Sequence, residues 1–200
     1  MSTFLRSLAV AAALGALSAA SAGATTLDFG TLPNESVNGV TAGGITFGYT
    51  EQGSPSLEAF FNVNVGAGAT QNIPGAALVG MTDGVLTLNF ASPMEFLSFD
   101  VAETTNLTLT PGYTVSLFGA GGHLLQTTNV ETDPLVFFTE GEFSYDGPAA
   151  STVEISFDPN DANEFALGPV SFGVPEPSST SIFALGLALL GMMAARRRQA

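Results

Sequence analysis

The chain of 200 residues lacks cysteine and tryptophan and has a single histidine, His123. Without cysteine the protein forms no disulfide, and zinc or iron–sulfur sites that depend on thiolate ligands are excluded. One histidine is too few for a histidine-rich transition-metal site. Stability must therefore come from buried apolar surface, and a hard cation such as Ca²⁺ is the metal that remains to be considered.

Basic residues are nearly as scarce. The chain has only Arg6, Arg196, Arg197 and Arg198, all of which lie near its ends. Of the 18 acidic residues, all but Glu176 lie between residues 25 and 173, which leaves 17 in a segment without lysine or arginine. Such a segment repels phosphate groups, so nucleic-acid binding is excluded. Its charge favours solubility, divalent cations or cationic partners.

The first 24 residues have the pattern of a secretory signal peptide. Arg6 precedes a largely apolar stretch over residues 8–20, and the small residues Ala22, Gly23 and Ala24 follow it. A basic residue, a short apolar segment and a small-x-small site are typical of a segment that signal peptidase removes. We therefore predict a signal helix that is cleaved at Ala24, so that the mature chain starts near residue 25.

The other end combines a proline motif, a short apolar run and a basic cluster. Pro175 and Pro177 fix the backbone in an extended form and remove two N–H donors. Residues 182–195 carry no charge and are rich in helix-forming Leu, Ala and Met. Such a helix is roughly 21 Å long, so it spans a bilayer only with help from thinning or snorkelling arginines. We predict a single transmembrane helix over about 181–195, with the arginines on the cytoplasmic side; a simple tail anchor is the alternative.

This order of motif, helix and basic cluster resembles a PEP-CTERM sorting domain, over about 25 of the 200 residues. The resemblance implies export by a bacterium that makes extracellular polysaccharide. It also implies that an exosortase, a membrane-embedded Cys transpeptidase, recognises the tail and cuts near the triplet, while the arginines stop transfer. The residues to which the resemblance assigns these roles are Pro175, Glu176, Pro177, Arg196, Arg197 and Arg198.

Residues 25–173 are predicted to form one all-β domain. Apolar and polar residues alternate with the period of a half-buried strand, and glycine, proline and aspartate punctuate these segments. The expected fold is an antiparallel β-sandwich of the jelly-roll kind. Strands are expected over residues 45–49, 85–90, 96–101, 113–117 and 152–157, with further candidates at 57–65 and 165–172. Turns are expected at residues 83–84, 111–112, 119–122, 146–148 and 158–160.

The order of these segments also resembles the carbohydrate-binding-like sandwiches that often precede this sorting tail. The matching segments are residues 27–29, 86–101, 152–157 and 165–173. Where such bodies read Ala-Leu-Asp-Asn in the last strand, this chain has Gly168 and Pro169 after Ala166 and Leu167. The departure removes an Asp-Asn pair that could hold a structural cation, so no site is transferred to that position.

A calcium site is the one metal site that the residues indicate. Ca²⁺ takes six to eight oxygen ligands, and a loop dense in Asp and Asn can supply several of them. The spacing differs from that of an EF-hand, and a solvated turn between two strands is the alternative. The residues concerned are Asp158, Asn160, Asp161, Asn163 and Glu164, with Glu131, Thr132 and Asp133 as a weaker second place.

Catalytic and sugar-binding patterns are weaker still. His123 follows a glycine-rich hairpin and is expected to be an exposed loop residue, and no serine lies in a G-x-S-x-G element. Sugar binding needs exposed aromatic rings. The adjacent pairs at residues 60–61 and 137–138 would each turn one phenylalanine outward if they lie in strands. The alternative is that the outward phenylalanines face a second layer of the fold.

We therefore expect an exported surface or matrix-associated protein with a structural or adhesive role and no enzymatic activity. Its expected partners are signal peptidase, an exosortase-like transpeptidase and extracellular polysaccharide. It would be held transiently in the inner membrane and then reach the cell surface. A carbohydrate-binding module, stabilised by Ca²⁺, is the first alternative, and a secreted hydrolase is the second.

Overall fold

The computed structural model describes residues 24–66 and 68–173, and these form twelve strands and one short 3-10 helix. All strand pairs are antiparallel. The elements are β1 (Ala24–Leu27), η1 (Phe29–Thr31), β2 (Thr41–Ala42), β3 (Ile45–Glu51), β4 (Ser54–Pro55), β5 (Ala59–Asn64), β6 (Ala76–Met81), β7 (Gly84–Glu103), β8 (Leu109–Phe118), β9 (Leu124–Pro134), β10 (Thr139–Phe157), β11 (Glu164–Leu167) and β12 (Val170–Gly173).

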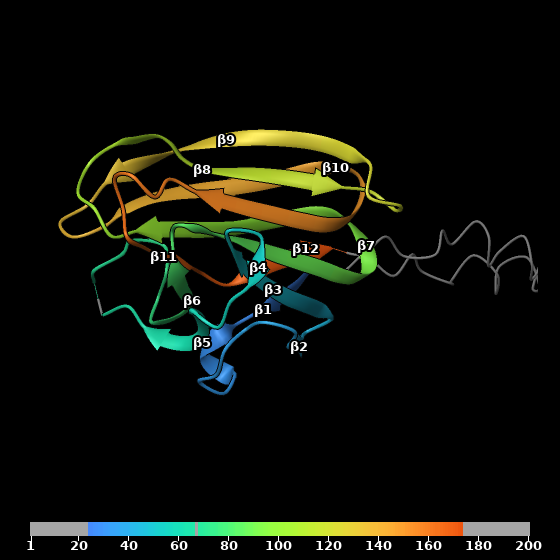
Figure 1. Ribbon diagram of the computed structural model, residues 1–200, viewed down its shortest axis with the longest axis horizontal. Coiled ribbons are helices and arrows are strands. Elements are labelled where there is room, and N and C mark those ends of the chain that lie inside the picture. Colours follow the sequence, from blue (N-terminus) through green and yellow to red (C-terminus); the bar gives the residue numbers. More distant parts are fainter. Residues whose placement is uncertain (1–23, 67, 174–200) are drawn as a thin grey trace, which may run out of the picture. The chain divides into compact units, whose positions relative to one another are not determined.

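Two long strands, β7 and β10, belong to two layers at once. Residues 84–90 of β7 pair with β3 and with residues 152–156 of β10, and β8 and β9 follow on the other side of β10. We call this layer sheet I. Residues 96–103 of β7 pair instead with β11, β12 and residues 139–146 of β10, and β6, β5 and β1 extend this second layer, sheet II. Figure 1 shows β7, β10, β8 and β9 side by side.

Aromatic rings fill the space between the two sheets. Phe157 of sheet I stacks on Phe165 of sheet II with ring centroids 3.8 Å apart, and Phe90 meets Phe172 edge to face at 5.2 Å. Phe157 and Phe165 belong to strands that do not pair with each other, and Phe90 lies in the half of β7 that does not pair with β12, so these rings meet across the core. Stacked and edge-to-face rings are favoured arrangements in cores. The protein is therefore a β-sandwich, as the alternating pattern predicts.

Proline and glycine lie where β7 and β10 change sheets. Pro93 lies between the two halves of β7, and Gly147 and Pro148 lie at the register break of β10 between Asp146 and Ala150. Proline cannot donate to a ladder and is tolerated at such irregularities. The predicted turn at residues 146–148 is thus wrong, because these residues bend a continuous strand. The predicted turn at residues 111–112 likewise lies inside β8, at a register shift.

The predicted core residues are buried as the period-two pattern requires. Ile45, Phe47 and Tyr49 of β3 face inward, and so do the alternate apolar residues of both halves of β7. The candidate strand at 57–65 is β5, whereas the candidate at 165–172 is split by Gly168 and Pro169 into β11 and β12. The longer stretches not predicted as strands are β6, β9 and the first half of β10, and the short β1, β2 and β4 were not predicted either.

The first and last strands of the sandwich lie side by side. Ala24, the first residue of β1, pairs with Gly173, the last residue of β12. The predicted signal helix with Ala22, the transmembrane helix at 181–195 and the six sorting residues lie outside the described residues. Within residues 24–66 and 68–173, no helix has the length and apolar character to cross a membrane.

Candidate functional site

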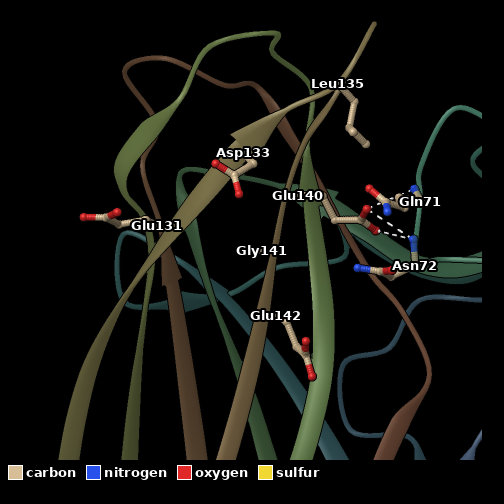
Figure 2. Close-up of a pocket in the computed structure, with 8 residues that line it drawn as sticks. All are labelled: Gln71, Asn72, Glu131, Asp133, Leu135, Glu140, Gly141 and Glu142. Carbon is tan, nitrogen blue, oxygen red and sulfur yellow. Dashed lines mark hydrogen bonds between the residues drawn. The ribbon is translucent and has the colours of Figure 1, made fainter.

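A pocket of about 220 Å³ lies on the outer side of sheet II. It forms between the hairpin that joins β9 to β10 and the segment that precedes β6, and Figure 2 shows the side chains around it. Most of the lining is polar, and half of the lining residues are acidic. The residues are Gln71, Asn72, Glu131, Asp133, Leu135, Glu140, Gly141 and Glu142.

Strand alternation places the carboxylates of this pocket. Thr139, Gly141 and Phe143 of β10 face the core, so Glu140 and Glu142 face outward. Asp133 pairs with Glu140 across the hairpin. The structure thus brings the weaker acidic segment of the sequence, residues 131–133, together with two glutamates that sequence analysis did not associate with it.

Glu140 is the most buried of these acids, and backbone donors satisfy it. Its carboxylate accepts hydrogen bonds from the N–H groups of Gln71 at 2.9 Å and Asn72 at 3.0 Å (Figure 2). These bonds hold the segment 71–73 against sheet II, where Ile73 covers a second apolar cluster with Ala77, Ala102 and Ala166. Glu140 therefore has a structural role, and the remaining carboxylates of the pocket are the ones open to a partner.

The pocket brings several carboxylates together, but they do not point toward one common position. Burial, and then the charges of Glu140 and Glu142, raise the pKa of the nearby Asp100 carboxyl group, while a hydrogen bond from Asn72 Nδ2 at 3.3 Å acts in the opposite direction. Figure 2 shows Glu131, Glu140 and Glu142 pointing in different directions. Among the described residues, no group of three or more His, Asp or Glu side chains is arranged to hold a metal ion. The free carboxylates can accept hydrogen bonds from hydroxyl or ammonium groups.

The residues predicted to bind calcium form a turn after β10. Asp158 Oδ1 accepts hydrogen bonds from the N–H of Asn160 at 2.9 Å and from its Nδ2 at 2.8 Å. The Asn163 carbonyl accepts from the N–H of Thr82, and the N–H of Glu164 donates to Thr104 Oγ1. Asp161 is exposed. Calcium binding by these residues stays a prediction, and their contacts are those of a hydrogen-bonded turn.

A buried carboxyl group was missed by sequence analysis. Glu103 is fully buried at the inward-facing end of β7, and neither of its oxygens has a hydrogen-bond partner. Thr132 and Thr139 are also buried with unpartnered hydroxyl groups, and a Cβ placed on Gly112 would lie 2.7 Å from Glu103 Oε2 and 2.9 Å from Thr132 Oγ1. Burial raises the pKa of Glu103 to about 8, and the charge of Asp158 adds to this. A signal was present, since Glu103 continues the inward series of Leu97, Phe99 and Val101.

One phenylalanine of each aromatic pair is exposed. Phe137 is 72% exposed while Phe138 packs on the second apolar cluster, although this pair lies in a loop. Phe60 is 39% exposed while Phe61 is buried. His123 is exposed in the hairpin before β9, with Nδ1 3.0 Å from the Ala120 carbonyl oxygen, as predicted for a loop histidine.

Comparison with solved structures shows a shared fold. The chain is similar to a cleaved adhesin domain of Lys-gingipain from Porphyromonas gingivalis, with a TM-score of 0.51 and 13% identity, covering 77% of this chain and 99% of that chain. A second cleaved adhesin domain of Lys-gingipain has a TM-score of 0.46 at 13% identity, covering 75% of this chain and 99% of that chain. A family 29 carbohydrate-binding module from Piromyces equi has a TM-score of 0.39 at 14% identity, covering 76% and 92%.

Comparison of the sequence with protein families identifies the tail. The model of the PEP-CTERM protein-sorting motif matches residues 173–198. The match starts at Gly173, the residue that ends β12. No curated protein matches the chain. The chain is therefore a protein that carries a PEP-CTERM protein-sorting motif.

Proposed function

We propose that the protein is exported, sorted through its C-terminal motif and displayed at the cell surface, where its sandwich has a structural or adhesive role. The observation that carries this proposal is the PEP-CTERM match at residues 173–198, directly after the last strand. Residues 1–24 act as the signal peptide, 25–173 as the displayed body and 174–200 as the sorting signal. The motif is acted upon by other proteins and performs no chemistry itself.

Two processing enzymes are the proposed partners. Signal peptidase removes the N-terminal segment at Ala22 to Ala24, and an exosortase-like transpeptidase recognises Pro175, Glu176 and Pro177. The arginines at 196–198 hold the end of the tail on the cytoplasmic side until the cut. Because Thr25 of β1 pairs with Phe172 of β12, both processed ends belong to neighbouring strands of sheet II. Only Val174 separates β12 from the triplet, so a cut there leaves the body with almost no linker.

The proposed role of the body is attachment within an extracellular polysaccharide matrix, without catalysis. Two observations support this role. The body has no lysine or arginine that would bind nucleic acid, and the most buried carboxylate of its pocket, Glu140, is occupied in holding segment 71–73. The cleaved adhesin domain of Lys-gingipain has a similar fold, which agrees with an adhesive role.

Processing tests the proposal directly. The full chain is produced in a bacterium that has an exosortase, and the mature protein is recovered from the surface fraction for mass spectrometry. We expect a protein that lacks residues 1–24 and ends near residue 175. The double variant Pro175→Ala and Pro177→Ala should stay in the membrane fraction with residues 196–200 intact, whereas Glu142→Ala, an exposed change outside the motif, should be processed normally. Wild-type protein at the surface with an intact terminus would contradict the proposal and favour a tail anchor.

A further inference from the structure

The outward side chains of sheet I lie in rows that cross five strands. The register aligns Thr46 of β3, Asn89 of β7 and Thr152 of β10, and the row ends at Phe118 of β8 and Leu124 of β9. Neighbouring strands are about 4.8 Å apart, so the row extends over roughly 19 Å. All five side chains are half-buried or exposed, as expected for a sheet surface that other elements leave open.

The next row along the strands has the same polar character. It aligns Thr87, Glu154, Ser116 and Thr127, and Glu154 is its one charged member. In the third row, Ser156 of β10 lies beside Thr114 and Asn129. We call this surface the hydroxyl face. Apart from Glu154 and the apolar Phe118 and Leu124, its groups are hydroxyls and amides, each of which donates and accepts hydrogen bonds.

Cross-strand hydrogen bonds fix the orientation of these groups. Thr152 Oγ1 donates to Asn89 Oδ1 at 2.9 Å, and Thr114 Oγ1 donates to Asn129 Oδ1 at 3.0 Å. The hydroxyls of Ser116 and Thr127 lie 3.2 Å apart. Each pair keeps further lone pairs for an external partner. Side chains that are ordered before binding lose less conformational entropy on binding.

Charge decides which partner fits this face. The described body carries 17 acidic residues and no lysine or arginine, yet Glu154 is the only carboxylate within these rows. A cationic partner would prefer the carboxylates on the outer side of sheet II. A neutral polysaccharide matches the hydroxyl face, because its hydroxyl groups also donate and accept hydrogen bonds. Phe118 and Leu124 add an apolar end against which the C–H face of a sugar ring can pack.

We propose that the hydroxyl face binds a neutral polysaccharide laid across β10, β8 and β9. This inference rests on the proposed function, since it names the surface and the class of polysaccharide through which the body attaches to the matrix. Phe118 and Leu124 contact the sugar rings, and the hydroxyl groups of Ser116 and Thr127 bond to the sugar hydroxyls.

Binding to polysaccharides of different charge tests the proposal. The full chain in nanodiscs of zwitterionic lipid is presented by biolayer interferometry to neutral polymers (hydroxyethyl cellulose, dextran and galactomannan), to anionic alginate and to cationic chitosan. We expect binding to at least one neutral polymer, and at least tenfold weaker binding for the triple variant Ser116→Ala, Phe118→Ala and Thr127→Ala. The matched control on the opposite sheet, Ser144→Ala with Glu142→Gln, should bind as the wild type does.

A second variant guards against loss of folding, because Phe118 is half-buried. Thr127→Glu changes one exposed side chain and places a new carboxylate on the face, so it should also weaken binding while circular dichroism shows an unchanged melting temperature. Four results would overturn the proposal: no binding to any neutral polymer, equal loss in the sheet II control, tightest binding to chitosan, or light scattering that shows a dimer broken by Thr127→Glu. None of them alters the processing result, so this inference can fail while the proposed function stands.

Discussion

The two halves of β7 and β10 have similar inward surfaces and different outward ones. Toward the core, both halves present alternating apolar residues. Toward the outside, β7 carries Thr87 and Asn89 in sheet I but Asp100 in sheet II, and β10 carries Thr152 in sheet I but Glu140 and Glu142 in sheet II. The core therefore dictates one side of each strand and leaves the other free to differ. The same two strands give the protein one face with a single carboxylate, Glu154, and one acidic face.

The acidic half differs in a second way, because it also places a carboxyl group inside. The inward series of β7 is fully apolar over Leu86, Leu88 and Phe90, whereas in sheet II it ends at the buried Glu103. A buried carboxyl group without a partner is costly when it is ionised. We therefore expect the contribution of sheet II to the free energy of unfolding to depend on pH and on single charge changes. We expect the contribution of sheet I to depend on neither.

The largest effect is expected where the two sheets meet. Phe165→Ala removes the ring that stacks on Phe157 and contacts Tyr49, so it should lower the free energy of unfolding by about 3–5 kcal/mol. Unfolding of the full chain by urea can be followed by far-ultraviolet circular dichroism, since there is no tryptophan. Phe60→Ala, in the 39% exposed position on β5, is the matched control and should cost much less. Equal losses would contradict the inter-sheet contact.

Glu103 should make stability depend on pH. Below about pH 4.5, its ordinary pKa, the group is protonated in both states; between 4.5 and about 8 the unfolded chain releases a proton that the folded chain keeps. The free energy of unfolding then falls by about 1.4 kcal/mol per pH unit from this group. Glu103→Gln imitates the protonated form, so we expect a gain on the order of a few kcal/mol at pH 8 and little change at pH 4.

Denaturation curves of the full chain at both pH values measure this difference. Glu142→Gln, an exposed change on the same sheet, is the control; it removes only a charge that adds to the raised pKa of Asp100, so it should alter the pH dependence much less than Glu103→Gln does. A Glu103→Gln protein that gains equally at pH 4 and pH 8 would show that packing, and not ionisation, separates it from the wild type.

The sequence predicts the core strands well because burial imposes alternation on them. In the strands predicted over 45–49, 85–90, 96–101, 113–117 and 152–157, the residues expected to face inward are buried. The prediction from sequence fails for β9, whose residues are largely Thr, Asn, Gln and acids. This strand lies at an edge of the sheet and contributes little to the core, so burial imposes no alternation on it. The turns predicted at Pro111 and Pro148 are wrong, because both prolines mark irregularities within strands. From sequence alone, a proline at such an irregularity has the same pattern as a proline in a turn.

The candidate site depends on contacts that sequence cannot supply. Glu140 and residues 71–72 are far apart in the chain, and only the fold brings their hydrogen bonds together. The rows of the hydroxyl face likewise need the register of five strands. The sorting motif is the opposite case, because its residues are contiguous and its order is itself the signal.

A smaller effect is expected at the acidic pocket. Glu140→Gln leaves one carbonyl oxygen to serve the N–H groups of Gln71 and Asn72, so it should lower stability by about 1–3 kcal/mol. Hydrogen exchange of these two amides should speed up, while exchange in sheet I stays constant. The control is again Glu142→Gln. Unchanged protection at residues 71 and 72 would mean that apolar packing around Ile73, and not the carboxylate, holds the segment.

The smallest effect is expected on the hydroxyl face. Thr152→Ala removes the hydrogen bond to Asn89 between two side chains that water reaches, so the free energy of unfolding should fall by only about 0.2–1 kcal/mol. The same urea measurement applies, with Thr26→Ala, which removes a hydroxyl pair with Ser171 on sheet II, as the matched control. A loss comparable to that of Glu140→Gln would show that the face supports the fold itself. A small loss would mean that the fold does not require these ordered hydroxyl groups. A surface that the fold does not require can be selected for binding.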